Sequence, residues 1–375
     1  MNKLVIDTDK LIKNIELIKS HSRSKIIAVL KANAYGLGLL EFANILQQNG
    51  IDFFAVADIR DGLKLRENGI SAQILLLTPT CQLEEAQLIA KNEIIATVGS
   101  MTSARVLNDA ASSLNVTANF HLKIDTGFGR FGFLPREIPD VCSFIKTLDN
   151  IQITGTYSHF SFSFSSKART VHKQYNTFMT AIDLMQQNGL EPGLLHICNS
   201  SAFLLFPEMH LDAVRIGSAF LGRILVNNTL GLEKIGYLKS RIIESRELPK
   251  NHNIGYANTY RTKKPTRIGI VPVGYVDGFG LGKKRDSFRL RDILSYIWKD
   301  VRLLKKKGVV VINGRPARIL GRININNIVV DLTNIDVGVG DEVILNNINP
   351  LLVGNHVERE YIGRVNRQCK YFCVN

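Results

Sequence analysis

The amino-acid sequence predicts an α/β protein, a TIM (β/α)8 barrel followed by a mainly β C-terminal domain. Up to about residue 225, eight apolar runs of strand length alternate with segments of helical periodicity, as expected for parallel strands joined by covering helices. Beyond about residue 230, short β-branched runs are separated by Asn, Gly and Pro turns, which is typical of antiparallel strands. The chain of 375 residues is also too long for one ordinary core.

The first expected barrel strand, residues 26–30, is an apolar run that ends at Lys31. Continuous apolar character over so short a run predicts a strand buried on both faces of a parallel sheet. Further strands are expected at residues 53–56, 74–77, 94–98, 120–124, 151–157, 194–197 and 211–214, and helices at 39–48, 60–68, 83–90, 103–111 and 170–187. A doubly wound open sheet is the alternative, but no G-x-G-x-x-G motif follows the first strand.

The C-terminal part of the chain is expected to form a separate β domain. Strands are predicted at residues 267–273, 308–312, 318–320, 328–332 and 342–345, with Asn313-Gly314 as a hairpin turn. The run at residues 1–7 is not followed by a helix of the barrel type, and we expect it to join this domain. The predicted organisation is therefore residues 1–7 with 233–375 for the β domain and residues 8–232 for the barrel.

One segment interrupts the β pattern. Apolar residues at helical spacing, with Lys and Arg between them, predict an inserted basic amphipathic helix at about residues 287–307. We expect this helix to pack its apolar face on the β domain. Binding to a membrane surface or to nucleic acid is the alternative interpretation.

Charge and cysteine content narrow the class of protein. The net charge is +14, and residues 283–307 alone contain ten Lys or Arg against three Asp, half of the excess. This uneven distribution favours attraction of a small anionic molecule, and no nucleic-acid partner is expected. No apolar run approaches the roughly 20 residues of a membrane span, so no membrane partner is expected. Five scattered cysteines and the absence of a secretory signal favour a cytoplasmic protein with reduced thiols, and no metal-ligand spacing occurs.

Barrel enzymes carry their catalytic groups at the carboxyl ends of the strands. Lys31 stands at the end of the first strand, where burial would lower the pKa of its amine and suit it to Schiff-base chemistry; a lysine that extends to solvent is the alternative. A loop of glycine and serine after the eighth strand could offer backbone amides to a phosphate. Tyr35 follows Lys31 after the first strand. The polar and small residues at the other strand ends are Lys123, Arg130, His159, His196, Asn199, Ser200, Arg215, Gly217 and Ser218.

Five motifs identify a family resemblance. They are Lys31-Ala32-Asn33-Ala34-Tyr35-Gly36, Leu122-Lys123-Ile124-Asp125-Thr126-Gly127-Phe128-Gly129-Arg130, Asn199-Ser200, Val214-Arg215-Ile216-Gly217 and Val273-Gly274-Tyr275-Val276-Asp277-Gly278. In this order they resemble the pyridoxal-phosphate-dependent alanine racemases, which are fold-type III amino-acid racemases. The resemblance implies pyridoxal 5'-phosphate as cofactor and interconversion of L- and D-alanine, in many bacteria for peptidoglycan.

The resemblance implies a two-base mechanism. Lys31 matches the lysine that binds the cofactor as a Schiff base and then takes the α-proton of the D-enantiomer. Tyr256 matches the tyrosine that acts on the L-enantiomer from the opposite face. A racemase needs two such groups because the proton must leave one face and return on the other. In the family this tyrosine reaches the active site of the partner subunit, so a homodimer is implied.

The remaining site residues are also carried over from the family. Arg215 matches the arginine that faces the pyridine nitrogen, and His159 matches the residue that orients this arginine and the cofactor ring. Arg130 matches a contact to the cofactor's phenolic oxygen and the substrate carboxylate, and Lys123 a lysine that is often carbamylated and positions this arginine. The cofactor's phosphate and its surroundings are matched by Tyr35, Asn199, Ser200, Gly217 and Ser218.

The sequence departs from the family pattern near the expected substrate gate. Ile325 replaces the usual methionine that offers a backbone contact to the substrate carboxylate, and Asn326 replaces an aspartate. Gly363 stands where a tyrosine usually narrows the gate, with Tyr361 two residues before it. These changes leave a racemase of serine or a longer amino acid as an alternative. A fold-type III decarboxylase and a non-catalytic pyridoxal-phosphate carrier are the further alternatives.

Overall fold

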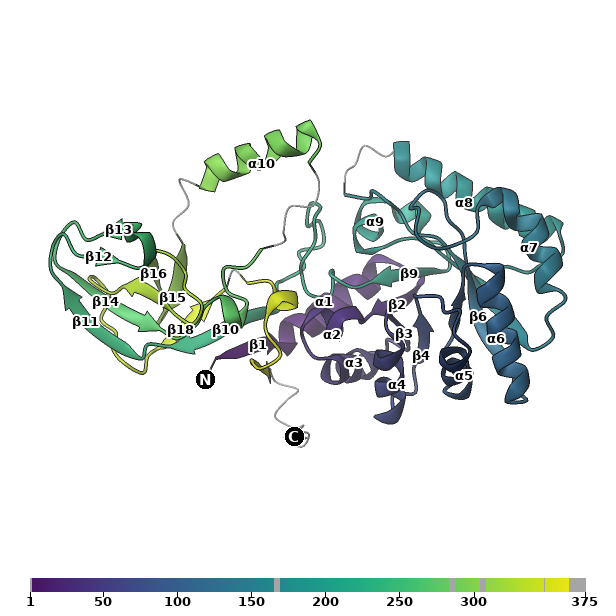
Figure 1. The fold of residues 1–375 in the computed structure, drawn as a ribbon, viewed down its shortest axis with the longest axis horizontal. Helices are drawn as coiled ribbons and strands as arrows, with labels where there is room; N and C mark the ends of the chain where they lie inside the picture. Colours follow the sequence, from purple (N-terminus) through teal and green to yellow (C-terminus); the bar gives the residue numbers. More distant parts are fainter. Residues whose placement is uncertain (1, 165–168, 283–287, 304–307, 347, 364–375) are drawn as a thin grey trace. The chain divides into compact units, whose positions relative to one another are not determined.

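The computed structural model describes residues 2–164, 169–282, 288–303, 308–346 and 348–363 (Figure 1). These residues divide into two compact units. One contains the described residues of Met1–Thr8 and Ile235–Asn375, and the other is Asp9–Lys234. Each unit has its own sheet.

The unit Asp9–Lys234 is a nearly closed barrel of eight parallel strands in the order β4-β3-β2-β9-β8-β7-β6-β5. The two edge strands meet through a parallel bridge between Leu75 and Ile95, where the Leu76 N–H donates to the Ile95 carbonyl (2.9 Å) and the Ile95 N–H to the Ile74 carbonyl (2.8 Å). This closure confirms the predicted TIM barrel and excludes the doubly wound open sheet.

The barrel strands are short and mostly buried, as their apolar sequences require. They are β2 (Lys25–Val29), β3 (Phe53–Val56), β4 (Gln73–Leu76), β5 (Ala96–Val98), β6 (Ala118–Lys123), β7 (Ile151–Tyr157), β8 (Leu194–His196) and β9 (Ala213–Ile216). The last begins later than the predicted range 211–214, because Leu211 has a φ of 54°, which no strand residue adopts. Arg215 therefore lies within β9.

Helices follow the strands around the barrel. They are α1 (Thr8–His21), α2 (Lys31–Tyr35), α3 (Leu39–Gln48), α4 (Ile59–Glu67), α5 (Leu83–Lys91), α6 (Met101–Ser113), α7 (Ile138–Ile145), α8 (Arg169–Gln187) and α9 (Ser200–Leu205). Local sequence sets their starts: Asp58 caps α4 at the Arg60 N–H, and Ser100 and Ser103 form a capping box on α6. No described helix is long and apolar enough to cross a membrane.

The other unit is built on a nine-stranded sheet in the order β11-β14-β17-β16-β15-β18-β10-β1-β19. Its strands are β1 (Lys3–Asp7), β10 (Gly236–Arg241), β11 (Glu244–Leu248), β14 (Thr266–Val271), β15 (Val309–Ile312), β16 (Arg315–Leu320), β17 (Ile328–Asp331), β18 (Glu342–Leu345) and β19 (Glu358–Ile362), beside the small hairpin of β12 (Asn253–Ile254) and β13 (Tyr260–Arg261). Strand β1 pairs antiparallel with β10 and parallel with β19. The N-terminal strand thus lies inside the C-terminal sheet.

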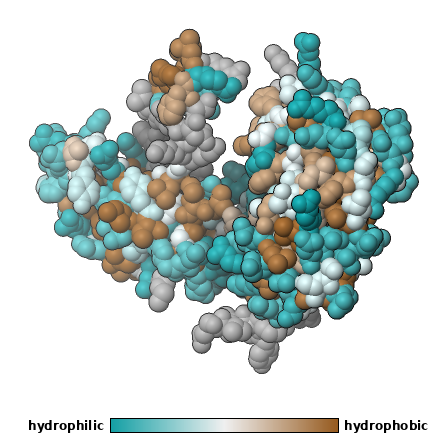
Figure 2. All heavy atoms as spheres, turned by 45° about the vertical axis from the view of Figure 1, so that its right-hand side comes forward, coloured by the Kyte–Doolittle hydropathy of each residue, from teal (hydrophilic) through white to brown (hydrophobic). Residues whose placement is uncertain are grey.

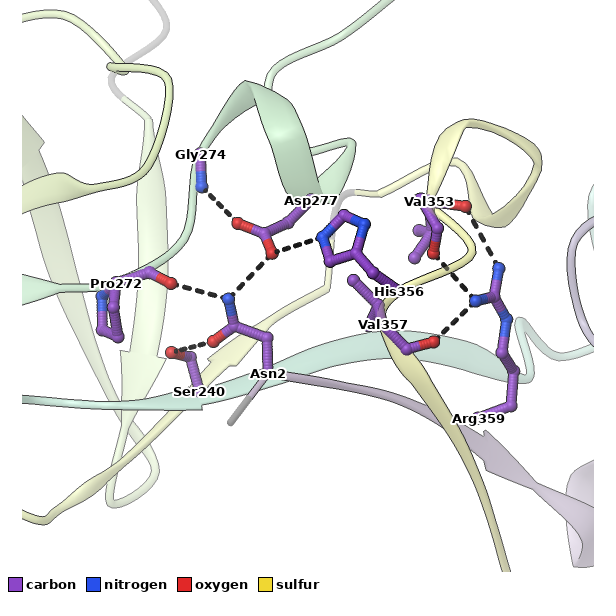
Figure 3. Close-up of polar contacts among 10 residues, drawn as sticks. Asn2, Ser240, Pro272, Gly274, Asp277, Val353, His356, Val357 and Arg359 are labelled. Atoms are coloured by element: carbon purple, nitrogen blue, oxygen red, sulfur yellow. Dashed lines mark hydrogen bonds and ion pairs between the residues drawn. The ribbon is translucent and has the colours of Figure 1, made fainter. Parts of the chain in front are cut away.

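Polar contacts attach the N-terminus to this sheet (Figure 3). The Asn2 side chain donates to the Pro272 carbonyl (2.6 Å) and to Asp277 (3.0 Å), and the Ser240 hydroxyl donates to Asn2 Oδ1 (2.7 Å). Asp277 also accepts the Gly274 N–H (2.9 Å) and faces His356 Nε2 (3.4 Å). The aspartate of the Gly274–Gly278 motif therefore orders the β domain.

The inserted helix is present as α10 (Leu290–Leu303), within the predicted range 287–307; residues 287 and 304–307 lie outside the described residues. The expectation that it packs its apolar face on the β domain is wrong. Leu290, Leu294, Ile297, Trp298 and Val301 are all exposed by more than half of their surface.

Candidate active site

Lys31 leaves the barrel on an unusual turn. It follows β2 and begins α2, whose next four residues, Ala32 to Tyr35, have φ values between 51° and 56°. This is the left-handed region, which costs ordinary residues roughly 1 kcal/mol each. The Asn33 side chain supports the turn by accepting the Leu39 N–H (2.8 Å). Such a run of strained residues is characteristic of functional sites, because the surrounding fold must hold it.

The turn presents the Lys31 amine to the rim of the barrel. The residue keeps an exposed surface, while the protein atoms around its amine, and next the charge of Arg130, lower its pKa. Its Nζ lies 5.9 Å from the centre of the Tyr35 ring. Lowering the pKa increases the fraction of neutral amine, which is the nucleophilic form.

Tyr35 closes one side of a small-residue cradle formed by the loop after β9. A Cβ atom placed on Gly217 would lie 2.2 Å from the Tyr35 hydroxyl oxygen, so glycine is required there. The Gly217 N–H donates to the Ser200 hydroxyl (3.0 Å), and Ser218 is half-buried beside it. Burial raises the pKa of Tyr35 to about 12, so its hydroxyl remains a hydrogen-bond donor at neutral pH.

Asn199 has a supporting position next to this cradle. Its Oδ1 accepts the N–H groups of Ser201 and Ala202, both at 3.0 Å, and caps the start of α9. The Ser163 hydroxyl donates to the same oxygen (3.0 Å). Asn199 thereby fixes the backbone that carries Ser200.

Arg215 is a fully buried cation held by neutral acceptors. Its Nη1 donates to His196 Nδ1 (2.6 Å), and its Nη2 donates to the Ser158 carbonyl (2.7 Å) and faces His159 Nδ1 (3.1 Å). Burial lowers its pKa to about 10, which leaves the guanidinium charged at neutral pH. None of the contacts described for Arg215 uses Nε, so this N–H remains for a group bound in front of it.

The arginine dictates the state of the histidines around it. An arginine cannot accept a hydrogen bond, so His196 must present its lone pair at Nδ1 and its proton at Nε2, which then donates to His121 Nδ1 (2.9 Å). Burial, and next the charge of Arg215, lowers the pKa of His159 and His196 well below the usual value and that of His121 to about 3. These histidines are therefore neutral acceptors in the folded protein.

An aromatic ring completes this cluster. The Tyr157 ring stacks on His196, with centroids 4.8 Å apart and planes 3° apart, and its hydroxyl is 2.9 Å from Thr97 Oγ1. His196, His121 and Tyr157 were not among the predicted cofactor ligands, although His196 and Tyr157 stand at strand ends in the sequence. The sequence does not show that these residues surround one buried arginine, because they lie on different strands that meet only in the folded barrel.

Arg130 and Lys123 lie on the loop and strand next to this cluster. Asp125 accepts the N–H groups of Gly127, Phe128 and Gly129 and so holds the loop. The Arg130 guanidinium lies 4.6 Å from the centre of the Phe128 ring, and that ring lies 5.4 Å from His159. Lys123 is buried; it donates to the Ile124 carbonyl (2.9 Å), and burial and then the charge of Arg215 lower its pKa well below the usual value.

Two predicted site residues belong to the other unit. Tyr256 is 73% exposed on a turn in which Gly255, Ala257 and Asn258 all have positive φ. Ile325 is 67% exposed, and its carbonyl accepts the Val276 N–H (3.0 Å). Gly363 follows β19 with a φ of 148°, and residues 364–375 lie outside the described residues.

Comparison with known proteins identifies both units. Residues 6–224 match the family model of the alanine racemase N-terminal domain, and residues 235–359 match that of the C-terminal domain. The alanine racemase of Clostridium perfringens is 34% identical over 351 residues, 91% of this chain and 84% of that protein. That of Methanococcus maripaludis is 32% identical over 90% of this chain and 87% of that protein.

Solved structures agree with the sequence comparison. The alanine racemase of Clostridium difficile 630 superimposes with a TM-score of 0.84 and 29% identity, covering 96% of this chain and 95% of that one. The enzyme of Streptomyces lavendulae gives 0.83 and 26%, covering 96% and 97%. The chain therefore belongs to the alanine racemase family of isomerases.

Proposed function

We propose that this protein is a pyridoxal-phosphate-dependent racemase that interconverts L- and D-alanine with Lys31 and Tyr256 as its two bases. The observation that carries the proposal is the Lys31 amine, held at the barrel rim on a left-handed turn with a lowered pKa. A lysine in this state is suited to bind a carbonyl cofactor and to move a proton.

The residues around Lys31 fit pyridoxal phosphate. The phosphate would bind at the cradle of Tyr35, Ser200, Gly217 and Ser218, where the lack of a side chain on Gly217 lets the Tyr35 hydroxyl lie against the loop after β9. The Arg215 Nε–H would donate a hydrogen bond to the pyridine nitrogen. Because arginine keeps its proton at neutral pH, that nitrogen would remain unprotonated. His159, kept neutral by burial, would lie against the ring.

Lys31 and Tyr256 would divide the proton transfer between two faces. Pyridoxal phosphate supplies the electron withdrawal that makes the substrate α-proton acidic. The Lys31 Nζ would remove or return that proton on one face, and the Tyr256 hydroxyl would do so on the other. Arg130 and the Ile325 backbone would hold the substrate carboxylate between them. Burial lowers the pKa of Lys123, and carbamylation of its amine would give Arg130 an anionic partner.

The exposed positions of Tyr256 and Ile325 support a homodimer. The turns that carry these two residues approach each other in the β domain. A Cβ on Gly321, four residues before Ile325, would lie 2.8 Å from the carbonyl oxygen of Ile254, two residues before Tyr256. On its other side, the backbone at Ile325 is packed against Gly274, where a Cβ would lie 2.3 Å from the carbonyl oxygens of Asn324 and Ile325. In the family that the sequence resembles, the matching tyrosine reaches the partner's active site, and the exposure of Tyr256 is compatible with that role. We infer that this surface contributes Tyr256 to the active site of the partner subunit.

A product assay tests the proposed reaction. The purified protein is incubated with pyridoxal phosphate and one L-amino acid at a time, and the D-enantiomer is measured by chiral chromatography. We expect D-alanine as the main product and a lower yield of D-serine. Racemisation that favours serine or a longer amino acid would support that alternative substrate in place of alanine. Release of CO2 without any D-product, or no reaction of a cofactor-loaded protein, would contradict the proposal.

The thiols fit a reducing compartment. Among the residues that the structure describes, Cys81 is an exposed free thiol, and Cys142 and Cys198 are buried free thiols. Free cysteines of this kind are typical of cytoplasmic proteins. We therefore place the reaction in the cytoplasm, where D-alanine is used for cell-wall precursors.

A further inference from the structure

Helix α10 carries an apolar face that the β domain leaves uncovered. Leu290, Leu294, Ile297, Trp298 and Val301 are between 55% and 75% exposed. Their spacing of four, three, one and three residues places them on one side of the helix. Figure 2 shows hydrophobic atoms gathered at the surface of this element. An apolar face of this extent marks an interaction surface.

The charge of the segment indicates what covers this face. Residues 283–307 contain ten Lys or Arg against three Asp, half of the net charge of the chain. An amphipathic helix that joins Trp and Leu on one face with Lys and Arg elsewhere has the composition of helices that lie in a membrane interface. The apolar side chains enter the acyl boundary, and the cations meet anionic headgroups.

Other partners satisfy this surface less well. Two copies of the segment packed against each other would bring together two strongly positive stretches, and lysine is depleted from the cores of protein interfaces. Nucleic acid would use the cations and gain nothing from Leu294, Ile297 and Val301. The 14 residues of α10 extend about 21 Å, which suits a helix lying along a bilayer surface.

We propose that α10 is a membrane-surface helix that binds the enzyme to bilayers containing anionic phospholipid. Leu294, Ile297, Trp298 and Val301 insert at the level of the headgroups, and the positive charge that the sequence gives this segment attracts it to anionic lipid. This proposal replaces the expectation from composition that the chain has no membrane partner. It does not depend on the proposed racemase reaction.

The single tryptophan of the chain makes the test specific. Because Trp298 is the one Trp in the sequence, its fluorescence reports on α10 alone. We expect vesicles of phosphatidylglycerol and phosphatidylcholine to shift its emission to the blue and to protect it from acrylamide. Vesicles of phosphatidylcholine alone should bind at least ~10-fold more weakly, and 0.5 M salt should reverse most of the binding.

A matched pair of variants links binding to the apolar face. Leu294→Glu places an acid on the face, and we expect it to weaken vesicle binding in co-sedimentation by at least ~10-fold. Leu88→Glu makes the same change at an exposed leucine of α5, 41% exposed, and should bind as the unaltered protein does. Circular dichroism of both variants confirms that each is folded.

Three results would overturn the proposal. One is unchanged emission and no co-sedimentation with anionic vesicles. The second is an emission maximum already shifted to the blue without vesicles that moves to the red on dilution, which would show that a second copy covers α10. The third is a shift with duplex DNA and none with vesicles, which would assign the segment to nucleic acid.

Discussion

At the scale of single residues, Arg215 organises the site. It is a buried cation whose partners are carbonyl oxygens and histidine nitrogens. Burial, and next the charge of Arg215, lowers the pKa of His196 and His159 and keeps both neutral. A buried charge is tolerated when it is hydrogen-bonded, and here the contacts described for the guanidinium use Nη1 and Nη2. The histidines therefore supply acceptors that the buried arginine needs to remain charged.

Replacing His196 should separate this role from ordinary packing. His196→Phe removes the acceptor of Arg215 Nη1, and we expect a loss of about 1–3 kcal/mol in the free energy of unfolding and at least a ~10-fold fall in the racemisation rate of the folded protein. His210→Phe is the control: His210 is buried and bonded to Ser22 and the Phe203 carbonyl outside the cluster. It should lose stability and keep its rate. Equal rates in both variants would contradict the role of His196.

Arg130 should control the ionisation of Lys31. Burial is the larger cause of the lowered pKa of Lys31, and the positive charge of Arg130, which disfavours the protonated amine, is the second. Arg130→Gln should therefore raise this pKa and move the pH dependence of pyridoxal-phosphate attachment to higher pH, measured by the growth of the visible cofactor band. Arg136→Gln, an exposed arginine further along the chain, is the control. An unchanged midpoint in Arg130→Gln would show that burial alone sets the pKa.

At the scale of elements, the site depends on two turns that meet. The left-handed turn of α2 carries Tyr35 against Gly217 in the loop after β9. β2 and β9 are adjacent parallel strands, with Ile27 opposite Arg215. The pairing of these strands therefore brings Lys31, Tyr35 and the cradle to one place.

Gly217→Ala tests this contact. The added methyl would lie 2.2 Å from the Tyr35 hydroxyl oxygen, so the ring or the loop must move. We expect the affinity for pyridoxal phosphate, titrated by absorbance, to fall by ~10-fold or more, the consequence of about 1.4 kcal/mol. Gly338→Ala, where a Cβ meets nothing within 4 Å, is the matched change and should bind the cofactor normally.

The neutral histidines should also make the barrel sensitive to acid. The folded-state pKa of His121, His159 and His196 lies below the ordinary value of 6.5, so the unfolded chain binds more protons than the folded one below pH 6.5. Stability is complete above that pH and falls as pH decreases toward about 3 for His121, by up to about 1.4 kcal/mol per pH unit for each histidine. Denaturant midpoints from pH 7 to 5 measure this, and His121→Asn should reduce the slope. A slope that His121→Asn leaves unchanged would contradict the assignment.

The sequence predicts the strongly patterned elements well and the charged edges poorly. The barrel strands are apolar runs, and their pattern gives the fold class. Strands β11 and β19, at the two edges of the other sheet, carry Glu244, Arg246, Glu358 and Arg359, and no apolar run reveals them. Charges on edge strands prevent pairing with other chains. The same charges interrupt the apolar run from which a strand would be predicted.

In the site, too, some residues could be predicted from the sequence and others could not. Lys31, Tyr35, Ser200 and Arg215 could be predicted because each stands in a recognisable motif at a strand end. The pairing of His196 with His121, residues 75 positions apart, could not, since it depends on strands that the barrel brings together. The exposure of α10 also could not be predicted, because spacing identifies an apolar face without saying whether anything covers it.

At the scale of the whole molecule, the two proposed bases lie in different units. Lys31 belongs to Asp9–Lys234, and Tyr256 to the β domain, where it is largely exposed on a turn beside Gly321 and Arg322. A two-fold symmetric dimer gives two equal sites when each chain lends its tyrosine to the other. Every complete site then needs residues from two copies of the chain.

Mixing two inactive variants measures this most directly. Lys31→Ala and Tyr256→Phe are each expected to lack racemase activity, and the two are co-expressed with different tags. In a mixed dimer one site carries both substitutions and the other carries neither, so random pairing should restore about one quarter of the unaltered activity. Purified mixed dimers that contain bound cofactor but racemise no alanine would contradict a site shared between two chains.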